Sequence, residues 1–177
     1  MDVDGVLTDG TFTWSASGEE SKSFSFEDVM GLSRARRAGL QLGLISGEDS
    51  PLVDRFAQKI GIASVVKGCK EKDIALRGFA AATGIPLQRL AYIGDDVNDL
   101  SALAIAGLSV APANAQPPVK AAVALVLERS GGRGAVRQLV EMILNARQGG
   151  RPQAAEQRPQ GAEQRPQAAE QKSEFKP

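Results

Sequence analysis

Residues 90–110 read LAYIGDDVNDLSALAIAGLSV and contain the pattern that decides the fold. A short apolar run at 90–93 is followed by a glycine and an acidic loop, then by a helical pattern at about 97–106, and then by a second apolar run at 108–110. Apolar runs that alternate with helical segments are typical of parallel strands joined by crossover helices. This stretch therefore predicts one strand–helix–strand unit of a parallel sheet.

The same alternation extends over residues 1–148. Further strand-like runs occur at 40–45, 62–66 and 124–127, and further helices are expected at about 28–38, 50–60, 70–83 and 133–147. Asp28 is expected to cap the first of these helices. We therefore predict an α/β fold, a Rossmann-like doubly wound parallel sheet with helices on both faces.

Residues 11–26 interrupt this alternation with TFTWSASGEESKSFSF. Two alternating stretches flank Ser17-Gly18, which predicts a β-hairpin that projects from the domain as a flap. The remaining gaps between motifs hold only single helices and strands, so no cap domain is expected.

Residues 149–177 differ in kind from the rest of the chain. RPQAAEQ at 151–157 recurs as RPQGAEQ at 158–164 and as RPQAAEQ at 165–171. Each unit carries a proline and no apolar residue except alanine, so the repeat suits neither a coiled coil nor a packed core. We expect a disordered, low-complexity tail.

Composition excludes several function classes. Among 177 residues, 21 Lys and Arg balance 21 Asp and Glu, which favours neither a nucleic-acid nor a membrane-surface partner. The single cysteine, Cys69, suits a reducing compartment, and a cytoplasmic location is expected. Histidine is absent, so any metal site must use oxygen ligands, which favours Mg²⁺.

Polar residues gather where the predicted strands end, which is where ligands bind in open parallel sheets. The candidates are Asp2, Asp4, Ser46, Gly47, Glu48, Lys72, Asp95, Asp96 and Asp99. Carboxylates held close together repel one another unless a cation neutralises them, and a hydroxyl with an ammonium can hold phosphoryl oxygens. This set favours phosphoryl transfer with Mg²⁺.

The four segments DVDGVLTDG, ISGE, Lys72 and GDDVND resemble, in this order, the motifs of the haloacid dehalogenase-like phosphatases. GEESKSFSFEDVMGL, AYIGDDVNDL, GLSVAPANA and SGGRGAVRQLVE resemble an uncapped subfamily of that family. Its members act on 3-deoxy-octulosonate 8-phosphate or on nine-carbon keto-sugar acid 9-phosphates, and related domains occur in acylneuraminate cytidylyltransferases. The resemblance covers residues 1–148.

The resemblance implies a role for each matching residue. Asp2 matches the nucleophile, which forms an aspartyl-phosphate, and Asp4 the general acid and base. Ser46 and Lys72 match the pair that binds the phosphoryl group. Asp2, Asp4 (through its carbonyl) and Asp95 match the Mg²⁺ ligands, with Asp96 and Asp99 as supporting positions.

The resemblance also implies a homotetramer in which the hairpin, with Phe12 and Trp14, covers a neighbouring site. The alternative is that these aromatic residues cover their own domain. A second alternative for the whole chain is a largely non-catalytic tetramerisation domain, although the intact acidic motifs argue against it.

Two residues bear on the substrate. Glu48 stands where most octulosonate phosphatases have Arg or Lys, and Glu48 with Lys59 matches a pair thought to read the nine-carbon sugar. This favours a nonulosonate 9-phosphate slightly over the eight-carbon substrate. Alternatively, Glu48 stabilises the start of a helix and Lys59 is a solvated helix residue. The turn before the last helix, GGRG, adds Arg133 as a possible substrate contact.

The front of the chain raises one more expectation. Only Met1 precedes Asp2, whereas a doubly wound sheet places a strand before this loop. We therefore expect the first strand to be truncated, with backbone groups of its neighbours left unpaired.

Overall fold

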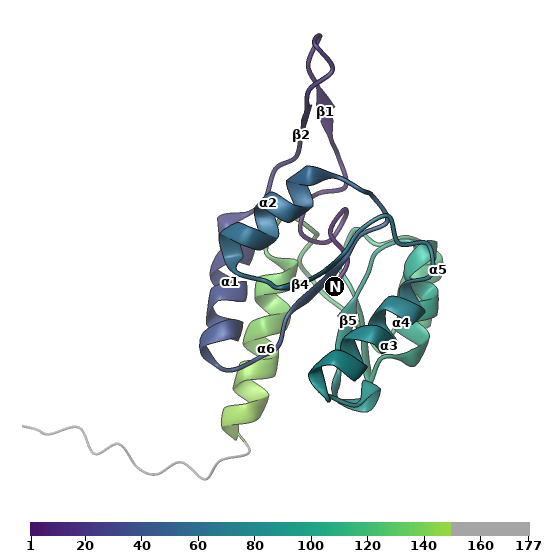
Figure 1. The fold of residues 1–177 in the computed structure, drawn as a ribbon. Coiled ribbons are helices and arrows are strands. Elements are labelled where there is room, and N and C mark those ends of the chain that lie inside the picture. The colour runs from purple at the N-terminus through teal and green to yellow at the C-terminus, as the bar shows by residue number, and fades with distance from the viewer. Residues whose placement is uncertain (150–177) are drawn as a thin grey trace, which may run out of the picture.

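The computed structural model describes residues 1–149. Within them, short parallel strands lie between two layers of helices, which confirms the predicted α/β class (Figure 1). The repeats that were expected to form a disordered tail lie outside the described residues.

The strands form two parallel ladders. In one, β3 (Gly43–Ile45) pairs with β4 (Ser64–Val66), with Gly43 opposite Ser64. In the other, β6 (Leu108–Ala111) lies between β5 (Ala91–Ile93) and β7 (Leu125–Val126), with Ala91 opposite Leu108. Each predicted apolar run overlaps one of these strands, and β6 extends one residue beyond its run, to Ala111.

Met1 and Asp2 lie between the two ladders. Met1 bonds to β3 in both directions, since its nitrogen donates to the Gly43 carbonyl (3.0 Å) and its carbonyl accepts from the Ile45 amide (2.9 Å). The Asp2 amide donates to the Ile93 carbonyl of β5 (3.0 Å). The strand order therefore reverses at these two residues, and their neighbourhood is the switch point at which open sheets bind ligands.

The helices cover both faces of the strands (Figure 1). One layer holds α1 (Phe26–Arg37), α2 (Pro51–Ile60) and α6 (Ala135–Gly149), and the other holds α3 (Lys72–Thr83), α4 (Leu100–Ile105) and α5 (Pro117–Ala122). Two 3₁₀ turns, η1 (Leu87–Arg89) and η2 (Val97–Asp99), complete the set. The pattern did not reveal α5, because six residues that begin with two prolines show no helical period.

Local sequence explains where the first helices begin and end. The Ser25 hydroxyl accepts from the Glu27 amide to cap α1, and Ser50 caps α2 directly before Pro51. The predicted cap at Asp28 is therefore wrong. Asp28 is buried in the first turn of α1, where its carboxylate accepts from the amides of Gly134 and Arg137 and so joins α1 to the start of α6.

The predicted hairpin is present as β1 (Thr13–Trp14) and β2 (Glu20–Ser21), and it projects from the body of the molecule (Figure 1). In residues 1–149 no cap domain is inserted beside it, as predicted. None of the helices that the structure describes is both long and apolar enough to cross a membrane.

Candidate active site

The loop after Met1 is anchored from below by its own apolar residues. Val3, Val6 and Leu7 are fully buried, and the Val3 carbonyl accepts from the amides of Leu7 and Thr8. The loop turns at Gly5, whose φ of +83° is favourable only for glycine. This anchoring holds Asp2 and Asp4 at the carboxyl ends of β3 and β5.

A buried lysine joins the two loops of the site. The Lys72 ammonium, at the start of α3, lies 2.9 Å from an Asp2 oxygen and 2.7 Å from an Asp99 oxygen, and its side chain is fully buried. The same Asp99 oxygen accepts from the Tyr92 hydroxyl (2.8 Å). Burial makes such a pairing necessary, since an unpaired charge here would be very costly.

The second oxygen of Asp99 shapes the acidic loop. It accepts from the amides of Asp95 (3.1 Å) and Asp96 (3.3 Å). Both Asp99 oxygens are thus engaged, and its part in the site is to hold this loop and Lys72. Asp96 is exposed, and its carboxylate caps η2 through the Val97 amide.

Asp95 differs from Asp99 in its hydrogen bonding, because one of its oxygens, Oδ1, is buried and has no hydrogen-bond partner. Its other oxygen lies against Gly5, where an added Cβ would come within 1.9 Å of it. A buried carboxylate oxygen without a partner requires an explanation, and a cation bound at this place would give it one.

Burial and neighbouring negative charges raise the pKa values of both Asp2 and Asp95. Burial and then the Asp99 charge raise the pKa of Asp2 to about 7, although Lys72 opposes this. Burial and the charges of Asp99 and Asp96 raise the pKa of Asp95 to about 7. Both groups resist ionisation until positive charge is supplied.

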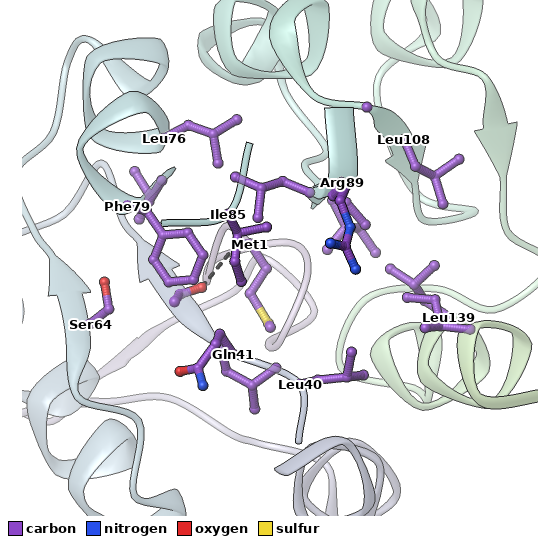
Figure 2. Close-up of a pocket in the computed structure, with 18 of the residues that line it drawn as sticks. Met1, Leu40, Gln41, Ser64, Leu76, Phe79, Ile85, Arg89, Leu108 and Leu139 are labelled. Atoms are coloured by element: carbon purple, nitrogen blue, oxygen red, sulfur yellow. Dashed lines mark hydrogen bonds between the residues drawn. The ribbon is translucent and has the colours of Figure 1, made fainter. Parts of the chain in front are cut away.

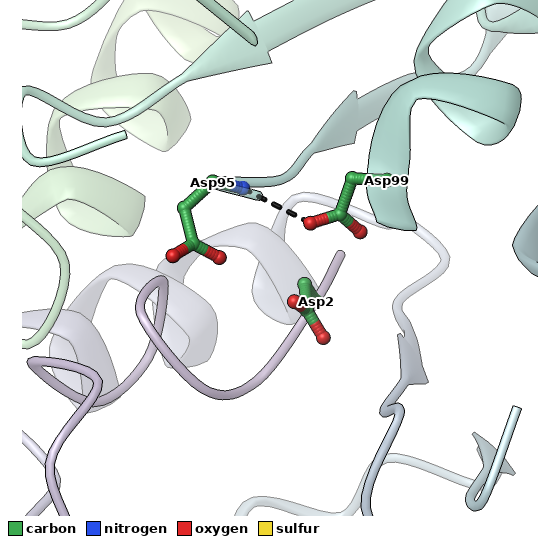
Figure 3. A group of neighbouring side chains, drawn as sticks. All are labelled: Asp2, Asp95 and Asp99. Atoms are coloured by element: carbon green, nitrogen blue, oxygen red, sulfur yellow. Dashed lines mark hydrogen bonds between the residues drawn. The ribbon is translucent and has the colours of Figure 1, made fainter. Parts of the chain in front are cut away.

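The acidic cluster fits a hard divalent cation. Asp2, Asp95 and Asp99 each place a carboxylate oxygen within 4.8 Å of the others, around a common space (Figure 3). Since Asp99 is already engaged, Asp2 and Asp95 are the side chains free to bind the ion. Two carboxylates that leave several positions open suit Mg²⁺, which keeps water and phosphate ligands.

The loop after β3 brings a hydroxyl to the same edge. Ser46 is fully buried, and its Oγ accepts from the Glu48 amide (3.1 Å). Gly47 lies beside the η2 turn, since a Cβ there would be 3.5 Å from the Asn98 amide nitrogen. Glu48 itself is exposed next to this edge.

The other two predicted contacts lie elsewhere on the surface. Lys59, in the last turn of α2, places its ammonium 5.7 Å from the centre of the Phe26 ring. Arg133 is exposed and lines a shallow depression together with Asp9 and Phe26. The structure does not join either of them to the carboxylate cluster, and their substrate contacts stay predictions.

Sequence reasoning missed Lys22, at the base of the hairpin. Its ammonium lies 2.9 Å and 3.0 Å from the two oxygens of Asp4, and 3.8 Å from Glu20, with only 3% of its side chain exposed. The signal was the alternation in EESKSF, which places Glu20 and Lys22 on one face of the returning strand. Tyr92 was missed because it lies inside the apolar run 90–93.

Comparisons with known proteins agree with this geometry. A family model described as haloacid dehalogenase-like hydrolase matches residues 49–139. The 3-deoxy-D-manno-octulosonate 8-phosphate phosphatase KdsC of Haemophilus influenzae is 43% identical over 145 residues, 82% of this chain and 81% of that protein. KdsC of Escherichia coli K12 is 35% identical over 146 residues, covering 82% and 78%.

Solved structures of such proteins are also similar. The Moraxella catarrhalis 3-deoxy-D-manno-octulosonate 8-phosphate phosphatase, in complex with a magnesium ion, a phosphate ion and a KDO molecule, superposes with a TM-score of 0.80 at 39% identity, covering 82% of this chain and 84% of that one. The cobalt-bound Haemophilus influenzae phosphatase gives a TM-score of 0.80 at 42% identity, covering 83% and 86%.

The cluster predicts a coupling between cation binding and pH. Because the pKa values of Asp2 and Asp95 rise from 3.8 to about 7, the folded protein keeps protons that the unfolded chain releases. Without a divalent cation, the stability from these groups should therefore fall as pH rises from about 4 to about 7. Added Mg²⁺ should raise the Tm more at pH 8 than at pH 5, because protons compete for its ligands. Thermal melts with Mg²⁺ or EDTA measure both effects.

Asp95→Asn tests the ligand assignment in the same assay. It should keep or raise the EDTA Tm at pH 8, because a buried charge is removed, while losing most of the gain from Mg²⁺. Asp96→Asn is the matched control, since Asn also caps a helical turn, and it should keep most of the gain from Mg²⁺ although it removes one charge near Asp95. An undiminished Mg²⁺ gain in Asp95→Asn would contradict the assignment.

Proposed function

Since the chain belongs to the haloacid dehalogenase-like hydrolase family, we propose that it is a Mg²⁺-dependent phosphatase of acidic keto-sugar phosphates, with 3-deoxy-D-manno-octulosonate 8-phosphate as its substrate. The observation that carries the proposal is the Asp2 carboxylate, buried at the sheet's switch point 2.9 Å from the Lys72 ammonium and beside the orphaned oxygen of Asp95. The relatives named above support the eight-carbon substrate.

The chain's own residues supply the nucleophile, the acid and base and the phosphoryl-binding groups of a two-step displacement. An Asp2 oxygen bonds to phosphorus, and the bond from phosphorus to the sugar oxygen breaks. Asp4, two residues on, gives a proton to the departing oxygen and later takes one from the water that cleaves the acyl-phosphate. Ser46 and Lys72 hold phosphoryl oxygens.

A bound Mg²⁺, held by Asp2, Asp95 and the Asp4 carbonyl, would supply positive charge against the carboxylates and the phosphoryl oxygens. Lys72 keeps a second duty in this scheme, because its contact with Asp99 fixes the loop that carries Asp95. The buried Lys72 ammonium thus lies between Asp2, the proposed nucleophile, and Asp99, which fixes the loop that carries Asp95.

Replacement of the nucleophile tests the proposal directly. Phosphate release from 3-deoxy-D-manno-octulosonate 8-phosphate should require Mg²⁺ and should fall at least about 1,000-fold in Asp2→Asn. A coupled assay for inorganic phosphate measures it, with Asp9→Asn as control because Asp9 is exposed and bonded only to Thr11 in the described structure. Activity retained by Asp2→Asn would contradict the proposal.

Glu48 keeps the nonulosonate 9-phosphate as a second candidate substrate. The residue is exposed at the edge of the site, where a carboxylate would accept hydrogen bonds from sugar hydroxyls or an amine and would repel a substrate carboxylate. This observation favours a longer sugar with more hydrogen-bond donors, whereas the relatives are named for the eight-carbon substrate.

Glu48→Arg separates the two substrates. The change should raise the ratio of kcat/KM for the eight-carbon over the nine-carbon substrate about tenfold, because it exchanges repulsion of the substrate carboxylate for attraction. Glu48→Gln, which removes the charge alone, should give an intermediate ratio. Equal ratios in all three proteins would show that Glu48 does not select the substrate.

Lys22 connects the hairpin with the proposed general acid and base, Asp4. By binding both oxygens of Asp4, it fixes the direction of the general acid and base relative to Asp2. Glu20, which lies 3.8 Å from Lys22, also accepts from the Trp14 indole and from the Ser50 hydroxyl that caps α2. The base of the hairpin is therefore tied to both the acid and the start of a core helix.

Lys22→Met should lower kcat about tenfold and change KM much less, because it releases a positioned group without removing a substrate contact. Lys22→Arg should restore most of the loss, and Lys70→Met, at an exposed position near the site, should have no effect. A selective rise in KM for Lys22→Met would instead assign this lysine to substrate binding.

A homotetramer remains part of the proposal. Phe12 and Trp14 lie on the hairpin with 55% and 65% of their surfaces exposed, and their rings are 4.9 Å apart. This supports the interface role over cover for their own domain. The alternative of a non-catalytic assembly domain has less support, because such a domain needs neither the buried lysine nor the acidic cluster.

A further inference from the structure

The loop that carries Asp2 and Asp4 is not equally supported on all sides. An apolar cavity of about 510 Å³ lies beside Met1, and side chains that include Phe79 and Leu139 line it (Figure 2). The packing that anchors the loop at its buried valines therefore does not continue to Met1. Contacts further along the loop carry more of its position.

One such contact comes from Asn114, in the loop that follows β6. Asn114 lies in a turn that is closed by the Ala115 amide, which donates to the Pro112 carbonyl (3.1 Å). The amide nitrogen of its side chain donates to the Gly5 carbonyl (2.9 Å), and the amide oxygen accepts from the Gly131 amide (2.6 Å). One side chain thus bridges the turn at Gly5 and the turn before α6.

The two turns that Asn114 bridges are packed directly against each other. A Cβ at Gly131 would come within 1.9 Å of the Gly5 oxygen, so glycine is required there. Gly5 also lies against the acidic loop, because a Cβ at Gly5 would come within 1.9 Å of an Asp95 oxygen. The peptide after Gly5 is therefore confined by two other loops, and Asn114 bonds to its carbonyl.

Gly5 directly follows Asp4, the proposed general acid and base. The Gly5 amide donates to the Thr8 hydroxyl (3.3 Å), which in turn donates to an Asp4 oxygen (3.4 Å). Side chains thus hold both backbone groups of Gly5, Thr8 at the amide and Asn114 at the carbonyl. Because glycine resists rotation less than other residues, loss of the Asn114 bond would leave the direction of Asp4 poorly fixed.

We propose that Asn114 is a positioning residue, which fixes the direction of the Asp4 carboxyl through the Gly5 carbonyl. The inference rests on the proposed phosphatase function, in which Asp4 gives a proton to the departing oxygen. Lys22 restrains the Asp4 carboxylate from the hairpin, whereas Asn114 restrains the backbone from the loop after β6. The acid is thus held by two separate elements of the fold.

Two aryl phosphates with different leaving groups test the proposal without contacts to a sugar. Phenyl phosphate needs a proton on its departing oxygen, whereas p-nitrophenyl phosphate releases a stable anion that needs less help. Asn114→Ala should therefore lower kcat/KM about tenfold for phenyl phosphate and less than about threefold for p-nitrophenyl phosphate.

Gln116→Ala is the matched control in the same loop. The Gln116 side chain is exposed and does not cap α5, and its backbone amide, which donates to the Asp95 carbonyl (2.8 Å), is retained in alanine. This variant should hydrolyse both aryl phosphates as the parent does.

Amide exchange at Gly131 measures the bridge in the absence of any substrate. Because the Gly131 amide donates to the Asn114 side chain, its exchange should become at least about tenfold faster in Asn114→Ala. It should stay unchanged in Gln116→Ala.

Faster exchange at Gly131, together with a loss concentrated on phenyl phosphate, supports the proposal. Equal losses for both aryl phosphates would show that Asn114 only stabilises the loop, and unchanged exchange would show that the bridge is absent; either result would overturn the proposal. A parent that hydrolyses both aryl phosphates but not 3-deoxy-D-manno-octulosonate 8-phosphate would contradict the proposed substrate, while the aryl comparison would still decide the role of Asn114.

Discussion

The contact between Lys72 and the two carboxylates of Asp2 and Asp99 is the interaction on which the rest of the structure depends. One ammonium, fully buried, faces two acids, and Asp95 adds a third negative charge nearby. The core therefore holds less positive than negative charge when all three acids are ionised. Burial, and after it the excess of negative charge, raises the pKa values of Asp2 and Asp95, and the unpaired Asp95 oxygen is a further reason why a cation fits the site.

The same contact joins three segments that are distant in the sequence. Asp2 comes from the front of the chain, Lys72 from the start of α3 and Asp99 from the turn after β5. Met1 and Asp2 also join the two ladders through their backbones. The residues that hold the sheet together are therefore the ones that carry or adjoin the reactive carboxylate. Gly5 lies at the same place, because the Asp95 carboxylate occupies the position that a side chain at residue 5 would take.

Much of the fold could be predicted from the sequence, because hydrophobic period and turn residues act locally. The five apolar runs, the hairpin and the longer helices follow from such patterns. Because ligands bind where the strands of an open parallel sheet end, the sequence also predicts that Asp2, Ser46, Lys72 and Asp95 belong to one site. The pattern could not show α5, whose prolines and length hide it. It also could not show that Ser25 rather than Asp28 caps α1, because the partners of Asp28 lie about a hundred residues away.

The parts of the site that were missed share a cause. Lys22 and Tyr92 act through side chains that only the packed structure brings to Asp4 and Asp99. A lysine in an exposed hairpin and a tyrosine in an apolar strand have ordinary local explanations, and the alternation in EESKSF shows that Lys22 shares a face with Glu20 but not that it reaches Asp4. The family resemblance covers both residues but assigned roles only to its motif positions, and it gave none to Lys22 or Tyr92.

The pairing of Tyr92 with Asp99 gives this molecule a built-in optical probe. The chain has one tyrosine and one tryptophan. The tyrosine is buried with its hydroxyl on the carboxylate that holds the metal loop, while Trp14 stands exposed on the flap. Tyrosine absorbance thus reports on the acidic cluster and tryptophan emission on the hairpin. Events at the two places can be followed separately, and their order in time compared, in an unlabelled protein.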